Sequence, residues 1–187
     1  MEIILASNSP RRKELLEKHN IKFKVIVSNV DEKTDSTLTV YENVKMLASL
    51  KAEDVFKANS DRIVLAADTI VVYNNEILGK PKDEEDAFRM LRLLSGNKHE
   101  VITAVAVISE ELKLIEYEVS TVEFREMSDE EIYEYIKTKE PMDKAGSYAI
   151  QGIGSKFIVN YVGEFDNIMG LPMKLVKELL KKQGLEV

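Results

Sequence analysis

Short apolar runs and helical apolar stripes alternate along the chain, and this alternation predicts strands and helices in turn. The apolar run at residues 2–6 predicts a buried first strand, and the alternating segment 23–28 predicts a second. Between them, Ser9 is a suitable N-cap, and Pro10 suits the first helical position, where no backbone N–H is needed. We expect this first helix to end near Asn20.

Later helix starts are marked by a Thr, Asp or Ser residue with an acidic residue three positions further on, a spacing typical of helix N-termini. The pairs are Thr39 with Glu42, Asp83 with Asp86, and Ser128 with Glu131. The corresponding helices are expected to end near Ala58, Gly96 and Lys139. A last helix is expected to begin near Pro172 and to end at Gly184.

The remaining apolar segments predict long strands. The run at 62–78 turns at Asn74-Asn75, which indicates a hairpin, and the runs at 100–109 and 114–124 predict two further strands. The glycine-rich segment 143–157 is expected to be irregular. A βα start followed by long, antiparallel-looking strands favours an α/β domain with an extended mixed sheet and flanking helices over a doubly wound one. With no repeat or linker in the sequence, we expect a single domain over residues 1–187.

Composition narrows the class of protein. The chain of 187 residues is 44% hydrophobic and 32% charged, which is ordinary for a globular protein. It has no cysteine, so disulfides and thiol catalysis are excluded. No apolar run is long enough for a membrane span, and the N-terminal run lacks a basic leader, so we expect a cytoplasmic protein that needs no membrane. The net charge of −7 argues against binding a nucleic acid polymer.

Arg11 and Arg12 stand in the first helical turn, where the positive end of the helix dipole disfavours cations. Two interpretations are open. The guanidinium groups can simply extend into solvent, at a cost of some tenths of a kcal/mol, roughly. Alternatively, a polyanion can lie on this turn and meet free N–H groups, the dipole and two arginines together.

Asp68 lies within the apolar run "VLAADTIVV", where an ionised carboxylate needs a cation, a metal or several N–H donors. It is either a structural aspartate bonded to nearby backbone or a general base or metal ligand. By residue type alone, Lys51 and Lys80 are solvated surface lysines. His19 and His99 are too scattered for a zinc site. The sequence has neither a Walker P-loop nor a Rossmann glycine fingerprint.

Several motifs, in one order along nearly the whole chain, resemble the Maf family of nucleotide pyrophosphatases. They are "LASNSPRRKELL" at 5–16, "KA" at 51–52, "AADTIV" at 66–71, "GKP" at 79–81, "LSG" and "HEVITAV" within 93–105, "EPMDKAGSYAIQGIG" at 140–154 and "NIMGLP" at 167–172. The resemblance implies an elongated α/β fold similar to that of inosine triphosphate pyrophosphatases, with a cleft between two lobes. It also implies hydrolysis of nucleoside triphosphates between the α and β phosphates, a divalent metal (Mg²⁺ or Mn²⁺) and a homodimer.

The same resemblance assigns expected roles to residues of this chain. Asp68 matches the general base, and Glu32 matches a second metal ligand beside it. The phosphate-binding cations match Arg11, Arg12, Lys51 and Lys80, with Ser7 next to them, and this gives Arg11 and Arg12 the anion that their helix lacks. Lys51 and Lys80 are expected to assist Asp68 in catalysis.

The resemblance extends to the base. Arg11, Thr69 and Gln151 match the subgroup that acts on dTTP and UTP, including modified uridine-type nucleotides. A glutamine amide offers the donor and acceptor that the edge of uracil or thymine requires, although from residue type alone Gln151 only ties down its loop. The alternative function is a non-catalytic nucleotide sensor or a partner-binding protein that affects septum formation.

Overall fold

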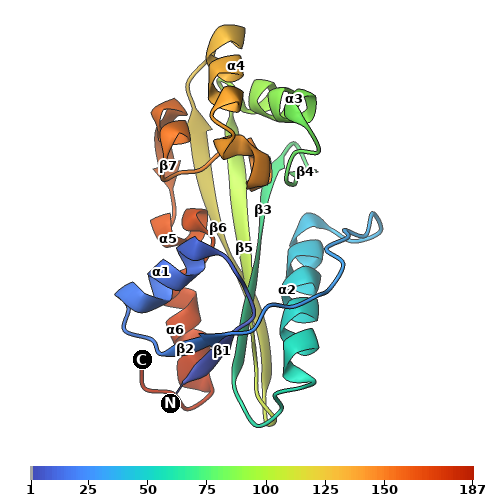
Figure 1. The fold of residues 1–187 in the computed structure, drawn as a ribbon, viewed down its shortest axis with the longest axis vertical. Coiled ribbons are helices and arrows are strands. Elements are labelled where there is room, and N and C mark those ends of the chain that lie inside the picture. Colours follow the sequence, from blue (N-terminus) through green and yellow to red (C-terminus); the bar gives the residue numbers. More distant parts are fainter. Residues whose placement is uncertain (1) are drawn as a thin grey trace. The chain divides into compact units, whose positions relative to one another are not determined.

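The structure is a computed structural model that describes residues 2–187. Its strands are β1 (Ile3–Leu5), β2 (Phe23–Val25), β3 (Val64–Tyr73), β4 (Glu76–Leu78), β5 (Lys98–Ile108), β6 (Lys113–Phe124) and β7 (Ile158–Val162). They form a seven-stranded sheet of order β2-β1-β3-β5-β6-β7, and β4 pairs with β3 (Figure 1). Strand β1 is parallel to β2 and β3, whereas the pairs β3–β4 and β6–β7 are antiparallel. The predicted mixed sheet is thus confirmed.

The helices begin close to the predicted residues. The α-helices are α1 (Pro10–Lys18), α2 (Val40–Phe56), α3 (Glu84–Leu94), α4 (Asp129–Lys137), α5 (Phe165–Met169) and α6 (Met173–Lys182). Short 3₁₀ helices are η1 (Glu140–Asp143), η2 (Ala145–Ser147) and η3 (Ile153–Phe157). Among residues 2–187, no helix combines the length and the apolar character that crossing a lipid bilayer requires.

The described residues group into two compact units. The first comprises the chain up to Asp68 together with 103–118 and 170–187, and the second comprises 69–102 and 119–169. Strands β3, β5 and β6 contribute residues to both. The single domain expected over 1–187 stays a prediction.

In the first unit, helix α2 lies on one side of the strands, and α1 and α6 lie on the other (Figure 1). The amphipathic stripe of α6 is buried as its spacing predicts, with Val176, Leu179 and Leu180 fully covered. Burial of a side chain of this size contributes about 1.5–3 kcal/mol of stability. This burial holds α6 within the unit that also contains Asp68.

The N-terminus of α1 differs from the prediction in one respect. Ser9 occupies the N-cap position with extended backbone, but its side chain makes no capping hydrogen bond. Instead, the Ser9 N–H donates to the hydroxyl of Ser7 at 3.2 Å. The hydroxyl that organises this turn therefore belongs to Ser7, a predicted site residue.

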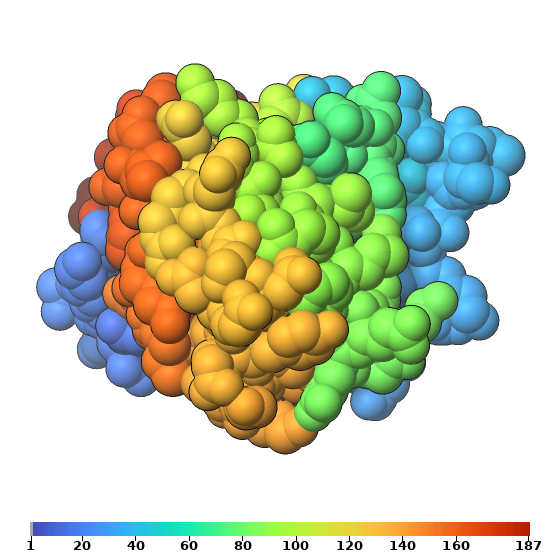
Figure 2. Space-filling model, turned by 90° about the horizontal axis from the view of Figure 1, so that it is seen from above, coloured from blue at the N-terminus to red at the C-terminus, as the bar shows by residue number. Residues whose placement is uncertain are grey.

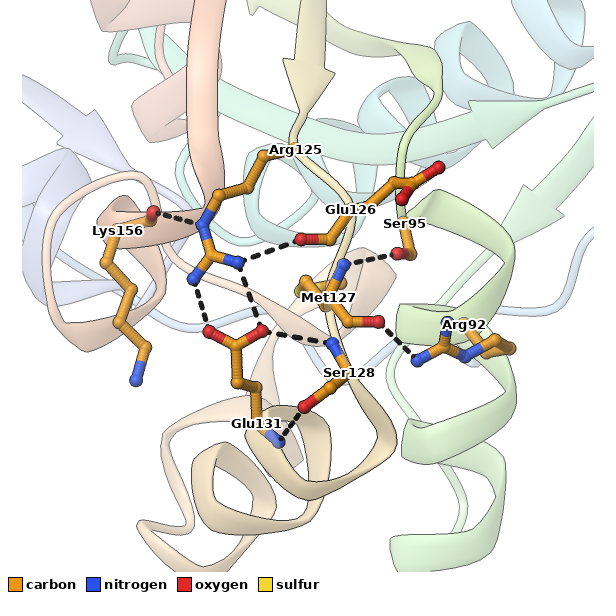
Figure 3. A network of polar contacts seen from close by, with 8 residues as sticks. All are labelled: Arg92, Ser95, Arg125, Glu126, Met127, Ser128, Glu131 and Lys156. Atoms are coloured by element: carbon orange, nitrogen blue, oxygen red, sulfur yellow. Dashed lines mark hydrogen bonds and ion pairs between the residues drawn. The ribbon is translucent and has the colours of Figure 1, made fainter.

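In the second unit, α3 and α4 lie side by side, and the surfaces of these two helices adjoin in the space-filling view (Figure 2). Phe88 of α3 stacks on Tyr133 of α4 with ring centroids 4.7 Å apart. The capping box of Ser128 and Glu131 is present as predicted. The Glu131 carboxylate also binds Arg125 with both oxygens, which joins α4 to the end of β6 (Figure 3).

Among the strands and α-helices, two were not predicted, β7 and α5. Four of the five residues of β7 are exposed, so the strand shows no alternation of buried and exposed positions that the sequence could reveal. The strand is fixed instead by its antiparallel pairing with β6. The segment 143–157, expected to be irregular, contains η2 and η3.

Candidate active site

Three predicted residues of the first unit, Glu32, Lys51 and Asp68, meet around a buried ion pair. Strand β3 carries Asp68, which is 5% exposed, and α2 carries Lys51, which is 7% exposed. The Lys51 Nζ lies 2.6 Å from Asp68 Oδ1 and 3.1 Å from Glu32 Oε2. Glu32 is half exposed, so the group has one side open to solvent. One ammonium thus binds the two carboxylates that were predicted to lie together.

Lys51 corrects an expectation from residue type. A lysine without a partner lies at the surface, because burying an unpaired ammonium is costly. Here the ammonium meets two acids, and its burial is offset by their charge. Residue type alone carries no information about that contact.

The loop that bears Glu32 is held by side chains of α2 that the sequence reasoning missed. Asp54 accepts a hydrogen bond from the Asn29 N–H at 2.9 Å. Asn43, fully buried, accepts from the Asp35 N–H at 2.7 Å and donates to the Asp35 carbonyl at 2.9 Å. A polar residue amid the apolar positions of α2 was the available signal for Asn43.

Arg12 is held in place rather than left in solvent. Its Nε donates to the Gly170 carbonyl at 2.8 Å, and its Nη1 donates to the Ser7 hydroxyl at 3.2 Å. Burial lowers the pKa of Arg12, and Arg11 lowers it further, whereas Asp68 and Glu32 raise it. The interpretation that the arginines of the first helical turn simply extend into solvent is therefore wrong for Arg12. Arg11, in the same turn, is half buried.

The second unit contains the other three predicted residues. Thr69 is half buried and follows Asp68 directly in β3. Lys80 is exposed just beyond β4, as its residue type predicts. Gln151 is exposed in the segment between η2 and η3. The ion pairs of Lys51 with Asp68 and Glu32 and the hydrogen bond from Arg12 to Ser7 are all made inside the first unit.

The carboxylate pair fits a hard divalent cation. Oxygens of Asp68 and Glu32 both lie within 3.1 Å of one cationic atom, Lys51 Nζ, so the two acids can converge on one charge. Mg²⁺ is typically held by one or two carboxylates together with phosphate oxygens and water. Across residues 2–187 there is no cluster of three or more His, Cys, Asp or Glu side chains arranged for a metal ion. A cation here would complete its coordination with further oxygen donors.

Comparison with known proteins supplies the family. A family model described as "Maf-like protein" matches residues 2–183. A dTTP/UTP pyrophosphatase of Caldicellulosiruptor bescii is 49% identical over 191 residues, covering 99% of this chain and 96% of that protein. A dTTP/UTP pyrophosphatase of Bacillus cereus (strain G9842) is 52% identical over 179 residues, covering 95% and 94%.

A solved structure has a similar fold. The Staphylococcus aureus Ham1 protein matches with a TM-score of 0.54 over 98% of this chain and 100% of that chain. The sequence identity is 18%, so this likeness concerns the fold alone.

Proposed function

The chain belongs to the Maf family, and on that premise we propose that it is a nucleoside triphosphate pyrophosphatase that converts dTTP and UTP to the monophosphate and pyrophosphate. Relatives of about half-identical sequence carry the name dTTP/UTP pyrophosphatase. One observation carries the proposal, namely the buried Asp68 carboxylate held by Lys51 beside Glu32. A carboxylate with a fixed orientation beside cations suits attack of water on a polyanion.

Asp68 is proposed as the general base. It takes a proton from a water molecule whose oxygen forms a bond to the α-phosphorus. The bond from the α-phosphorus to the bridging oxygen breaks, and pyrophosphate leaves with the bonding electrons. Lys51 orients the Asp68 carboxylate, and no covalent intermediate on the protein is needed.

The cations are proposed to hold the triphosphate. Arg12 is already oriented by Gly170 and Ser7, so less freedom is lost when it binds phosphate oxygens. Arg11 and Lys80 add positive charge, and the first turn of α1 offers free N–H groups to the anion. Asp68 and Glu32 would hold Mg²⁺ or Mn²⁺, which supplies further charge neutralisation of the phosphates when bound.

Thr69 and Gln151 are proposed to read the base. The Gln151 amide can donate to a carbonyl and accept from the N–H of uracil or thymine. Cytosine presents an amino group in place of one carbonyl, which leaves a mismatched contact. Such a mismatch costs about 1–3 kcal/mol, or about ten- to a hundredfold in rate.

The test measures pyrophosphate release by the purified protein with dTTP, UTP, dCTP, dATP and dGTP. The proposal expects kcat/KM for dTTP and UTP to exceed the other three. It also expects Gln151→Ala to reduce the preference in kcat/KM for dTTP and UTP. This reduction should be larger than the fall in the rate with dCTP. Absence of turnover with bound nucleotide would instead support a nucleotide sensor, and a purine preference would overturn the assignment of the base.

The family resemblance supports two further parts of the proposal. The protein is proposed to act as a homodimer on free nucleotides of the cytoplasm, including modified uridine-type nucleotides, rather than on a nucleic acid polymer. The net charge of −7 agrees with a substrate that is held by a few local cations only. Sedimentation of the purified chain would test the dimer.

A further inference from the structure

One carboxylate, that of Glu140, holds the segment next to Gln151. Its Oε1 accepts from the Ile153 N–H at 3.0 Å, and its Oε2 accepts from the Gly154 N–H at 2.9 Å. The Oε2 also accepts from the Tyr135 hydroxyl at 2.6 Å. Three donors on one carboxylate therefore connect α4, through Tyr135, to the start of η3.

The charge states suit this arrangement. Burial raises the pKa of Glu140, but the hydrogen bonds from Tyr135, Gly154 and Ile153 lower it by more, so the pKa is below its ordinary value. Burial and the adjoining Glu140 carboxylate raise the pKa of Tyr135. At neutral pH an ionised acceptor thus meets a neutral donor, and charge-assisted hydrogen bonds are the stronger kind.

Two glycines allow this close approach. Gly152, which directly follows Gln151, has a φ of 137°, and a Cβ there would lie 2.1 Å from Glu140 Oε1. A Cβ at Gly154 would lie 2.4 Å from the Tyr135 hydroxyl oxygen. A side chain at either position would displace the carboxylate or the phenol. The backbone that follows Gln151 thus packs directly against the Glu140 carboxylate.

The far end of the same segment is also fixed. Arg125 donates from Nε to the Lys156 carbonyl at 3.3 Å while its other nitrogens bind Glu131 (Figure 3). Phe157 is fully buried, with its ring centroid 5.2 Å from that of Tyr135. Gln151 itself is exposed. The backbone that follows Gln151 is thus held at both ends, and the exposed Gln151 side chain is available to a ligand.

We infer that Glu140 is a positioning residue for nucleobase selection: it fixes the backbone beside Gln151 so that the amide meets the base in one orientation. Glu140 acts through Gln151 and does not itself contact substrate. A preorganised contact loses less conformational freedom on binding, which strengthens discrimination. The inference rests on the proposed function, in which Gln151 reads the base.

The test compares Glu140→Gln and Tyr135→Phe with the control Ser128→Ala, which removes a helix cap of the same unit without touching the Glu140 contacts. We expect Glu140→Gln to lower the ratio of kcat/KM for dTTP over dCTP by about tenfold, the size of one mismatched hydrogen bond. The loss should lie in the rate with dTTP, with dCTP turnover nearly unchanged. Tyr135→Phe should cause a smaller loss in the same direction, and Ser128→Ala none.

A double variant separates positioning from a merely structural role. In the Gln151→Ala background, Glu140→Gln should cause no further loss of the ratio, because both changes remove the same contact. Additive losses would overturn the inference. The inference would also be overturned if Gln151→Ala lowered the ratio of kcat/KM for dTTP over dCTP while Glu140→Gln and Tyr135→Phe left it unchanged. If Glu140→Gln does not fold, Tyr135→Phe decides. A wild-type protein that does not prefer dTTP over dCTP would instead overturn the proposed reading of the base.

Discussion

The Nζ of Lys51 lies 2.6 Å from Oδ1 of Asp68, and both side chains are less than a tenth exposed. This pair joins α2 to β3 within the first unit. Its second acid, Glu32, comes from a loop and reaches the same ammonium at 3.1 Å. A contact of this kind links stability and chemistry, because the group that orients Asp68 also neutralises it.

Lys51→Ala should therefore destabilise the protein strongly. Removal of the ammonium leaves the Asp68 charge buried and unpaired, which costs about 3–5 kcal/mol of unfolding free energy. Urea denaturation followed by circular dichroism measures it. The control is Lys45→Ala on the same helix, whose Nζ is 4.0 Å from Glu116 and whose side chain is 37% exposed; it should cost less than about 1 kcal/mol. Equal losses would show that the buried pair adds nothing special.

Asp68→Asn should keep the fold and lose the reaction. The amide preserves the shape but cannot take the proton from water, so turnover should fall about a hundredfold or more. Initial rates of pyrophosphate release from dTTP measure this effect. The control is Asp86→Asn, which removes a carboxylate that pairs with Arg89 on α3. This variant should retain near wild-type turnover. Near wild-type turnover by Asp68→Asn would remove this residue from the mechanism.

Chelation of divalent ions should abolish turnover, and addition of Mg²⁺ or Mn²⁺ should restore it. The two carboxylates around Lys51 are hard oxygen donors, and the sequence contains no cysteine as a soft ligand. Glu32→Gln should raise the Mg²⁺ concentration required for half-maximal rate, which a metal titration at fixed nucleotide concentration determines. Full activity in excess EDTA would contradict the metal-assisted reaction.

Arg12→Ala should lower the melting temperature of the nucleotide-free protein. Helix electrostatics alone predict the opposite, a slight stabilisation of the nucleotide-free protein when this cation is removed. The structure reverses the sign, since Gly170 and Ser7 would lose their donor. The loss of about 1–3 kcal/mol corresponds to a drop of about 2–12 °C. The rise in melting temperature caused by dTTP should shrink as well. The control is Lys13→Ala on the same helix, which removes only an exposed contact to Asn8 in the preceding segment and should change neither value.

Stability should fall as the pH drops from 6.5 toward 3 because of His99. Burial lowers the pKa of His99 from 6.5 to about 3, and its Nε2 lies 2.8 Å from the Tyr148 hydroxyl. Between these values the unfolded chain binds a proton that the folded protein does not, so each pH unit costs up to about 1.4 kcal/mol. Urea unfolding at pH 7, 6 and 5 measures the slope. In His99→Gln the slope should be shallower by this amount, and an unchanged slope would assign the acid sensitivity to other groups.

The sequence alone determined the elements and the chemistry available to the protein. Capping pairs placed the starts of α2, α3 and α4, because an N-cap oxygen satisfies backbone N–H groups a few residues away. The apolar stripe of α6 and the long strand β3 followed from local periodicity. The order of motifs identified the family, which the matched family model and the relatives confirm.

Only the tertiary structure decided which polar groups meet. Lys51 and Asp68 are 17 residues apart, and Arg12 and Gly170 are 158 apart, so no local rule connects them. Local periodicity measures how one segment buries its apolar face, whereas these contacts depend on how distant segments pack. The same reason explains why the sequence left β7 unpredicted and gave Glu140 no role. Strand β7 forms by pairing with β6. The contacts of the Glu140 carboxylate form only when the glycine-containing backbone of residues 152–154 packs against it.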